Sequence, residues 1–434
     1  MTPLTNRRKP CYVRHLACHL PRDTFRTSLG MSISQKNHNS PPNPPVAFTK
    51  SLKERARELG FALCGVCPAV TPGGLHHLAQ WLDAGYAGEM TFLEEYAHAH
   101  EHPRYVLDGA RSLLLLAMNY HAPQHHAPYY REEAGHVLEP GHGRVASYAR
   151  GTDYHDVIHG RLRELKDWFH AQHPAAAVRG VVDSAPIMER EFAQLAGLGW
   201  IGKNTLLLNR QQGSWFFLSV LLTDVVLDYD AATEVDHCGT CTACLDACPT
   251  DAFPSPYVVD ARKCISYLTI EHRTQIPKEL RAGMGDWLFG CDVCQEVCPW
   301  NNHAPEATEN SFRQHIAGDH IDLCELLTLD ETEFRRRFRR TPLWRPKRRG
   351  LLRNAAIVLG NQRHRPALPA LGQALSDEES IIRGAAAWAL GQIGGEQALL
   401  ALRGRNTVET DPDVCDEIAA AIAQCDQSSR LTAD

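Results

Sequence analysis

The sequence predicts a mixed protein, of the α/β or α+β class, that is built from three parts of different character. Short apolar stretches alternate with helical patterns up to about residue 230, which is typical of an α/β core. Eight cysteines fall between residues 235 and 302 among turn-forming residues, and small-residue helices recur beyond residue 350. A length of 434 residues, with 44% hydrophobic and 22% charged residues, allows about three such domains.

The sequence does not predict a membrane-spanning protein. No apolar run approaches the roughly 18 residues that a transmembrane helix requires. The first residues are basic but contain no continuous apolar core, so they do not resemble a secretory signal. We therefore expect a cytoplasmic protein without a membrane partner. No self-complementary feature is visible, so we expect a monomer.

The first part of the chain divides into an extension and a core. Residues 1–46 are rich in Pro, Asn, Ser and His and are predicted to be a disordered extension. The core is expected over residues 47–232 and begins with a helical pattern from Thr49. Its other elements are buried-strand candidates at 112–118, 177–182 and 215–226 and an amphipathic helix at 155–170.

Cysteine spacing is the most specific signal in the chain. The run Cys238-x2-Cys241-x2-Cys244-x3-Cys248-Pro is typical of bacterial proteins that hold two iron–sulfur clusters. In such paired runs the fourth cysteine binds the other cluster. We therefore assign one [4Fe-4S] cluster to Cys238, Cys241, Cys244 and Cys298, and the second to Cys248, Cys264, Cys291 and Cys294.

These cysteines define an expected ferredoxin-like module at residues 233–303. The alternative is a pair of structural zinc sites with four cysteines each, although zinc does not require this spacing. Two iron–sulfur clusters in series accept and deliver single electrons, so the protein must also hold a terminal acceptor.

Two short motifs indicate ligands without identifying them. Residues 197–202 match G-x-G-x-x-G, but a dinucleotide site requires a preceding strand, and a helical stretch precedes this motif. These glycines are better explained as a helix end and as backbone that approaches a ligand. Asp153-Tyr154-His155 resembles a cobalamin-ligating D-x-H-x-x-G motif, but Ile158 occupies the glycine position. A lower axial histidine ligand is therefore not predicted, and His155 equally suits the start of a helix.

The last part is predicted to be a short HEAT-like repeat at residues 350–427. The pattern from Leu352 to Gly360 recurs from Arg383 to Gly391 with a period of 31 residues, and a terminal helix follows. So few repeats bury little apolar surface alone, so they should pack on the rest of the chain. Residues 304–349 form a basic segment that connects the module to the repeat.

Several of these motifs occur together and in order in one known family. They are Asp153-Tyr-His155, Val182-Asp183-Ser-Ala-Pro186, Gly199-Trp-Ile-Gly-Lys-Asn204, both cysteine arrays and the terminal repeat. Over residues 47 to 425 the chain resembles the epoxyqueuosine reductase family. The resemblance implies a cobalamin-binding core similar to that of reductive dehalogenases, two [4Fe-4S] clusters and the last step of queuosine synthesis on tRNA.

The implied reaction is a two-electron deoxygenation that converts the epoxide of epoxyqueuosine into the alkene of queuosine. Electrons would pass through the clusters to cobalamin and give cob(I)alamin. The resemblance assigns the proton for the departing oxygen to Asp183, and a substrate contact to Arg190, two turns along the same helix. A solvated aspartate is ionised at neutral pH, so this role requires burial, which disfavours the charged form. The alternative is that Asp183 only ends a strand and caps the following helix.

The resemblance also implies a set of contacts to the corrin ring, several of them through the backbone. They are His100, Ala146, Asp183, Leu207, Leu218, Ser266 and Asp292. His100 departs from the family pattern, because relatives can place an arginine before Pro103 where this chain has a histidine.

A tRNA substrate requires a basic surface, and the sequence supplies one between residues 335 and 353. This stretch contains nine arginines and Lys347 without an acid, a net charge of +10 in a chain whose net charge is −6. Concentrated positive charge is typical of nucleic-acid binding. Phe334, Phe338 and Trp344 interleave with it and are expected to stack on bases. The predicted tRNA contacts are His272, Arg336, Arg348 and Arg349. The alternative is a solvated, partly disordered linker that these aromatic residues anchor.

The sequence is also compatible with other classes of protein. A ferredoxin-type electron-transfer protein or a small-molecule reductase like the dehalogenases would need neither the basic stretch nor the repeat. An RNA-binding repeat protein with structural clusters would need neither Asp183 nor the cobalamin-like motifs. For the enzyme, we expect an external electron donor such as flavodoxin or ferredoxin.

Overall fold

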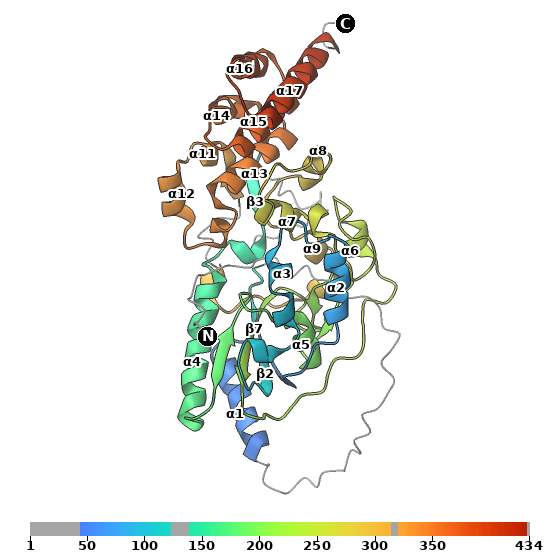
Figure 1. The fold of residues 1–434 in the computed structure, drawn as a ribbon, viewed down its shortest axis with the longest axis vertical. Coiled ribbons are helices and arrows are strands. Elements are labelled where there is room, and N and C mark those ends of the chain that lie inside the picture. Colours follow the sequence, from blue (N-terminus) through green and yellow to red (C-terminus); the bar gives the residue numbers. More distant parts are fainter. Residues whose placement is uncertain (1–43, 123–138, 314–319, 432–434) are drawn as a thin grey trace.

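The computed structural model describes residues 44–122, 139–313 and 320–431. Helix α1 (Pro44–Glu58) and the helical repeat lie at opposite ends of an elongated molecule, with the cysteine module on one side between them (Figure 1). Most of the predicted disordered extension lies outside the described residues, although α1 already begins at Pro44. Within the described ranges, no helix is long and apolar enough to cross a membrane.

A four-stranded sheet forms the centre of the core, with strand order β1-β2-β7-β4. Its strands are β1 (Leu63–Pro68), β2 (Ser112–Asn119), β7 (Phe216–Thr223) and β4 (Val178–Val181). Each neighbouring pair is antiparallel, so the core is α+β, and the α/β alternative is wrong for this sheet. The three predicted strands are confirmed as β2, β4 and β7, whereas β1 was not predicted.

The two central strands, β2 and β7, are buried at every residue because helices cover both faces of the sheet. Leu114 and Leu116 pack into the same cluster as Ile158 of α4 (Tyr154–Gln172). The alternate residue Leu115 packs into the cluster of Phe192 from α5 (Glu189–Leu195). A strand covered on both sides must be apolar at every position, which explains its continuous apolar sequence. The predicted helix at 155–170 is confirmed as α4.

A second, three-stranded sheet joins three parts of the chain in the order β8-β3-β9. The core contributes β3 (His142–Val145), the module contributes β8 (Trp287–Phe289), and the connecting segment contributes β9 (His320–Asp322). Strand β3 runs parallel to β8 and antiparallel to β9. The connecting segment also forms α11 (Leu323–Leu327) and α12 (Glu331–Phe338). The alternative of a disordered linker is therefore wrong for the described part of residues 304–349.

Short elements complete the core and the module. They are α2 (Leu75–Asp83), α3 (Phe92–Glu95), α6 (Ala243–Asp246), α7 (Ile265–Ile270), α8 (Lys278–Arg281), α9 (Val293–Glu296), α10 (Asn310–Arg313) and the strand pair β5 (Trp200–Ile201) and β6 (Leu207–Leu208). Helices α6 and α9 each carry a cysteine of the two arrays and pack against one another. This packing brings the two arrays together.

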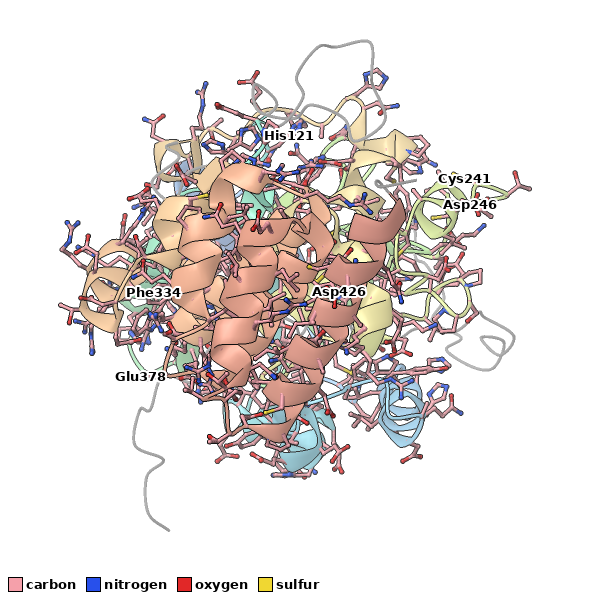
Figure 2. The ribbon with its side chains drawn as sticks, turned by 90° about the horizontal axis from the view of Figure 1, so that it is seen from above. His121, Cys241, Asp246, Phe334, Glu378 and Asp426 are labelled. Carbon is pink, nitrogen blue, oxygen red and sulfur yellow. The ribbon has the colours of Figure 1, made fainter. Side chains whose placement is uncertain are left out.

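Five helices form the repeat: α13 (Lys347–Asn361), α14 (Leu368–Ala374), α15 (Ser380–Ile393), α16 (Glu396–Asn406) and α17 (Pro412–Leu431). Helices α13, α15 and α17 lie side by side across the top of the molecule (Figure 2). A Cβ at Gly360 would come within 2.9 Å of the Ala389 backbone, and one at Gly391 within 2.9 Å of Ala421. The repeated small residues therefore permit this close packing.

One buried arginine attaches the repeat to the cysteine module. Arg353 of α13 is fully buried and donates hydrogen bonds to the carbonyl oxygens of Leu268, His272 and Thr274, at 2.7–2.8 Å. These carbonyls lie at and just beyond the end of α7, where a helix leaves its last acceptors without partners. The expectation that the repeat packs on the rest of the chain is confirmed.

Candidate functional site

The first group of cysteines lies at the surface of the module, and we call it the first quartet: Cys238, Cys241, Cys244 and Cys298. Burial raises the pKa of Cys244 to about 12, and the charges of Cys298, Cys238 and Cys241 add to this shift. All four thiols therefore lie close enough to interact. Cys298 is buried, whereas Cys241 is exposed at the outer edge of the module beside Asp246 (Figure 2).

The second quartet, Cys248, Cys264, Cys291 and Cys294, is more enclosed. Burial raises the pKa of Cys294 well above its usual value, and the charges of Cys291, Cys264, Cys244 and Cys248 add to it. Burial likewise raises the pKa of Cys264 to about 11, with a contribution from Cys248. The amide of Ala252 donates to Cys248 Sγ at 3.4 Å. The structure thus gathers the predicted sets of four, and the interaction of Cys294 with Cys244 places the quartets side by side.

The quartets fit iron–sulfur clusters, because eight thiols gather in two sets of four and each set could ligate one four-iron cluster. Zinc would also accept four thiolates, but it does not require the spacing of these cysteines. The positive charge of iron would compensate the charge of the thiolates.

Asp183 lies just after β4 in a left-handed backbone conformation, with φ of 51°. Its side chain is buried, and the Tyr154 hydroxyl donates to Asp183 Oδ2 at 2.7 Å. Helix α5 begins only at Glu189, and its N-cap residue is Met188. The alternative that Asp183 caps this helix is therefore wrong. The expectation that Asp183 and Arg190 share one helix is wrong for the same reason.

His155 lies beside the same carboxyl. Its Nδ1 lies 2.8 Å from Asp153 Oδ1, and its Nε2 lies 3.9 Å from Asp183 Oδ2. Burial alone would lower the pKa of His155, but the hydrogen bond and charge of Asp153 and the charge of Asp183 raise it above 6.5. Asp153 also caps α4 by accepting from the His155 amide at 3.1 Å. The helix start at His155 is thus confirmed, and it directs the ring toward Asp183.

A pocket opens at this carboxyl, lined by Tyr154, Asp183, Glu189, Phe217 and Leu218. Tyr154, Phe217 and Leu218 give it aromatic and aliphatic walls, and Asp183 and Glu189 give it two acids. Apolar walls of this kind suit contact with part of a flat ring such as a corrin. Leu207 and Leu218 share one core cluster. Arg190 is buried in α5 and donates to the carbonyl oxygen of Thr205.

Three other predicted corrin contacts, Ala146, Ser266 and Asp292, lie near cysteines of the second quartet, whereas His100 lies in a separate turn. The Ser147 amide and hydroxyl, next to Ala146, both donate to Asp292 Oδ2 at 2.7 Å. Burial raises the pKa of Tyr148 well above its usual value, and the charges of Asp183 and Asp292 contribute. Tyr148 therefore lies within range of both acids. Ser266 lies in α7, two residues after Cys264, and His100 is buried in a 3-10 turn with Nδ1 3.0 Å from the Tyr96 carbonyl oxygen.

The predicted tRNA contacts fall into different environments. Arg336 has a side chain that is 75% exposed and pairs with Glu333 on the same helix. Arg348 is largely buried against Asp377, and Arg349 donates to the Arg273 carbonyl oxygen. Burial lowers the pKa of His272, whose Nε2 lies 2.8 Å from the Gln275 carbonyl oxygen.

Two of the three aromatic residues of the basic stretch are too buried to stack on bases. Phe334 and Phe338 are 0% and 1% exposed, and Trp344 stacks on Phe334 with ring centroids 5.8 Å apart. They anchor α12 to the molecule. The expectation that Phe334 and Phe338 stack on bases is therefore wrong, because core packing already covers their rings.

Sequence reasoning missed several residues of the site. Tyr154, between the two named residues of the Asp153–His155 motif, was given no role, although its hydroxyl contacts Asp183. Glu189 was also missed, because no motif distinguishes it from other acids at helix starts. The position of Tyr154 inside a motif was the available signal.

The site and fold define a class: an iron–sulfur oxidoreductase whose α+β core is followed by a helical repeat. Family models match a 4Fe-4S double cluster binding domain at residues 237–301, epoxyqueuosine reductase QueG at 101–184, and HEAT repeats at 348–423. The epoxyqueuosine reductase of Pseudomonas aeruginosa is 41% identical over 82% of this chain and 97% of its own length. That of Xanthomonas campestris pv. campestris is 39% identical over 81% of this chain and 98% of its own length.

A solved structure supports the same assignment. An epoxyqueuosine reductase with an epoxyqueuosine-modified tRNA-Tyr stem loop superposes with a TM-score of 0.80 at 28% identity, over 88% of this chain and 99% of its own. The chain belongs to the epoxyqueuosine reductase family, a family of oxidoreductases. The resemblance read from the motifs is confirmed.

Proposed function

We propose that this protein reduces the epoxide of epoxyqueuosine at the tRNA wobble position to the alkene of queuosine, the last step of queuosine biosynthesis. The reaction consumes two electrons and two protons, and the epoxide oxygen leaves as water. One observation carries the proposal: a buried carboxyl, Asp183, lines a pocket with apolar walls, and Tyr148 interacts both with Asp183 and with Asp292, the neighbour of Cys291. Tyr148 thus connects the proposed acid with the second quartet.

In this proposal Asp183 is the proton donor. The carbon–oxygen bond breaks more easily when the departing oxygen receives a proton, because an alkoxide is a poor leaving group. Tyr154 donates to Asp183 Oδ2, so the proposal assigns the proton transfer to the other carboxyl oxygen, Oδ1. Asp153 and His155 hold the start of α4 beside this carboxyl. Arg190 is the proposed substrate contact from α5.

The proposed cofactors are two [4Fe-4S] clusters and cobalamin. When bound, cobalamin supplies a strongly reducing, nucleophilic metal centre for the two-electron step. The residues proposed to hold it in a reductive-dehalogenase-like core are His100, Ala146, Asp183, Leu207, Leu218, Ser266 and Asp292. The first quartet, through the exposed Cys241, is nearer to an external donor such as flavodoxin or ferredoxin.

The proposed division of the chain follows the sequence: an extension at 1–46, the core at 47–232, the cluster module at 233–303, the basic segment at 304–349 and the repeat at 350–427. The repeat and basic segment would bind the tRNA, with contacts from His272, Arg336 and Arg349, whereas the fourth expected contact, Arg348, already pairs with Asp377. We further propose that the enzyme acts as a monomer in the cytoplasm. A reductase that acts on small molecules would not need a tRNA-binding surface.

The test is conversion of epoxyqueuosine in tRNA, read by nucleoside mass spectrometry with anaerobically reconstituted protein, cobalamin and a chemical reductant. Asp183→Asn should lower the rate by about 10²–10⁴-fold, because it removes the acid but keeps the shape. Asp156→Asn, an exposed acid in the first turn of α4, is the matched control and should keep its activity. A rate for Asp183→Asn within twofold of the unchanged protein, at equal cofactor content, would refute the assignment of the acid.

A further inference from the structure

The G-x-G-x-x-G stretch has no part in the proposed chemistry so far. Its last glycine, Gly202, begins a tight turn between β5 and β6. Two hydrogen bonds of 2.8 Å close this turn: the Gly202 amide donates to the Leu206 carbonyl oxygen, and the Thr205 amide donates to the Gly202 carbonyl oxygen. Thr205 has a positive φ of 66°. A Cβ at Gly199 would come within 2.0 Å of the Leu208 carbonyl oxygen, so only glycine fits there. The turn is therefore rigid, and its tip, Lys203-Asn204, contacts the cysteine module.

Lys203 contacts the loop of the first quartet at several points. Its Nζ donates to the carbonyl oxygens of Gly239 at 2.7 Å and Cys241 at 2.9 Å. Its backbone amide forms a hydrogen bond with the Cys238 thiol. The ammonium group is thus held against the segment that carries two of the four thiols. The side chain is half-buried, so water screens its charge only in part.

The next residue makes an uncharged contact with the second quartet. Asn204 is 4% exposed, and its Nδ2 donates to the Cys294 carbonyl oxygen at 3.2 Å. The same turn therefore contacts both quartets from the core side, with a cation at the first and a neutral amide at the second. Arg190 fixes the turn on its other side through the Thr205 carbonyl oxygen.

A cluster gains one negative charge when it accepts an electron. A nearby cation stabilises that charge, whereas a neutral amide does so only through its dipole. The acids near the first quartet act in the opposite direction: Asp236 accepts from the Cys238 amide at 2.7 Å, and Asp246 lies on α6. Two cations oppose them: Arg210 contacts the ring of His237, directly before Cys238, and Lys203 contacts the backbone of the loop itself.

We propose that Lys203 is a positioning residue whose ammonium group raises the reduction potential of the first cluster, so that this cluster can accept an electron from an external donor. The inference rests on the two clusters of the proposed function, but it does not depend on the tRNA substrate. It assigns the G-W-I-G-K-N run a role as the contact between the core and the electron-entry cluster.

The test is an EPR-monitored redox titration of the full-length, anaerobically reconstituted protein. Lys203→Met and Lys203→Gln should make reduction of the first cluster about tenfold less favourable, a shift of about 59 mV for one electron. Lys203→Arg should restore the potential, because it keeps the charge. Lys263→Met is the matched control: it removes an exposed lysine one residue before Cys264 and should leave the first cluster unchanged.

Iron and sulfide content is measured first for each variant. Two filled clusters in Lys203→Gln with an unmoved potential would overturn the proposal, and so would a shift that Lys203→Arg does not restore. Loss of the first cluster in both neutral variants would show that Lys203 builds the site rather than setting its potential, and would also overturn it. Failure of the unchanged protein to bind any cluster would instead contradict the proposed function.

Discussion

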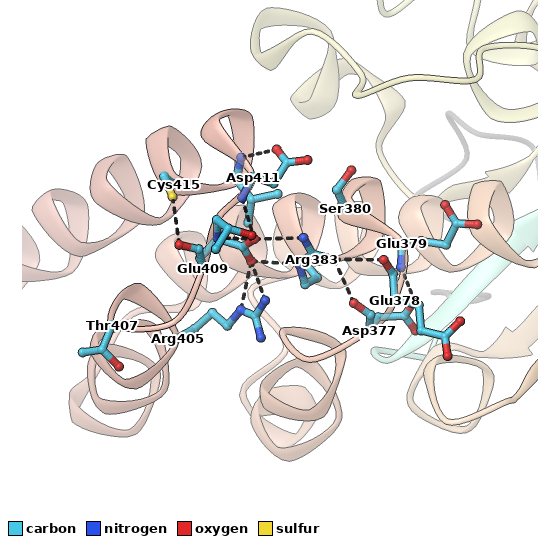
Figure 3. Close-up of polar contacts among 12 residues, drawn as sticks. Asp377, Glu378, Glu379, Ser380, Arg383, Arg405, Thr407, Glu409, Asp411 and Cys415 are labelled. Atoms are coloured by element: carbon cyan, nitrogen blue, oxygen red, sulfur yellow. Dashed lines mark hydrogen bonds and ion pairs between the residues drawn. The ribbon is translucent and has the colours of Figure 1, made fainter.

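The cysteine module and the helical repeat differ in how their buried ionisable groups are compensated. In the module, burial raises the pKa of Cys291 and Cys294 well above the usual value, and the like charge of neighbouring thiols adds to this shift. In the repeat, the hydrogen bond from Arg383 and a second one from Arg405 hold the pKa of Glu409 far below its usual value. Figure 3 shows this carboxylate between the two guanidinium groups.

The difference shows where each region obtains its stability. The Glu409 side chain is fully buried, with Arg383 at 2.8 Å and Arg405 at 2.8 Å, so the repeat compensates its charges with its own residues. In the described part of the module, Lys203 donates to backbone carbonyl oxygens beside the thiols and not to the thiols themselves, so iron would supply the remaining compensation. We infer that the repeat is stably folded without a cofactor, whereas the module needs its clusters to be stably folded.

The largest expected effect follows from removing iron from the module. Removal of iron with a chelator, or the substitution Cys291→Ser, should lower the rate of epoxyqueuosine conversion at least about 100-fold. Either change should also increase hydrogen exchange across residues 233–303. Exchange in α15 and α17 should change little, because no cluster ligand lies in the repeat. Hydrogen exchange with mass spectrometry measures both regions in one sample.

Cys324→Ser is the matched control for this experiment. Cys324 is half-buried in α11 and belongs to neither quartet. It should keep both clusters and the activity. Equal loss of protection in the repeat and in the module after chelation would contradict the proposed independence of the two regions.

A smaller effect is expected from the ion pair of the repeat. Glu409→Gln should destabilise the repeat by about 3 kcal/mol at pH 7, since it leaves two arginines with an uncharged partner. Because the folded pKa of Glu409 is depressed, its contribution is fully present above the unfolded value of about 4.3 and is lost as the pH falls below it. The unchanged protein should therefore keep its protection in α15 between pH 7 and pH 5 and lose it as the pH falls below about 4.3, and the variant should lose less over that lower range.

Hydrogen exchange of α15 and α17 in the full chain, corrected for intrinsic rates, measures this difference. Glu396→Gln is the control, because Glu396 is exposed at the start of α16. It should keep the pH dependence of the unchanged protein. The same pH dependence in Glu409→Gln would show that another acid is responsible.

Local patterns in the sequence predicted much of this structure. The apolar runs located β2 and β7, because a strand covered on both faces needs no alternation. The spacing of the cysteines predicted which of them gather, because short turns restrict where each thiol can lie. The period of small residues predicted α13 and α15, because close helix packing requires small side chains at the contact.

Long-range contacts were not predictable in the same way. The antiparallel order of the central sheet depends on how distant segments pair, and β9 pairs with a strand more than 170 residues earlier. The hydroxyl of Tyr154 meets Asp183 only because α4 packs on the sheet. Phe334 and Phe338 interleave with arginines, so their burial depends on which side of α12 meets the rest of the molecule.

The smallest expected effect on folding concerns the basic stretch, whose arginines divide between surface and interior. Arg335, Arg336 and Arg339 are exposed on and beside α12, whereas Arg353 is fully buried and Arg348 pairs with Asp377. Arg336→Glu combined with Arg339→Glu should leave the thermal midpoint unchanged. It should weaken tRNA binding and reduce the salt dependence of log Kd by about one for each lost phosphate contact.

Arg348→Gln separates the two groups of arginines. It removes the same charge from the same stretch, but it breaks the contact with Asp377 and the hydrogen bond to the Leu329 carbonyl oxygen. It should therefore lower the thermal midpoint and leave the salt dependence of tRNA binding nearly unchanged, because this guanidinium already has partners in the protein. If the salt dependence of tRNA binding falls in Arg348→Gln and stays constant in the α12 variant, the tRNA-binding surface lies at the start of α13 and not on α12.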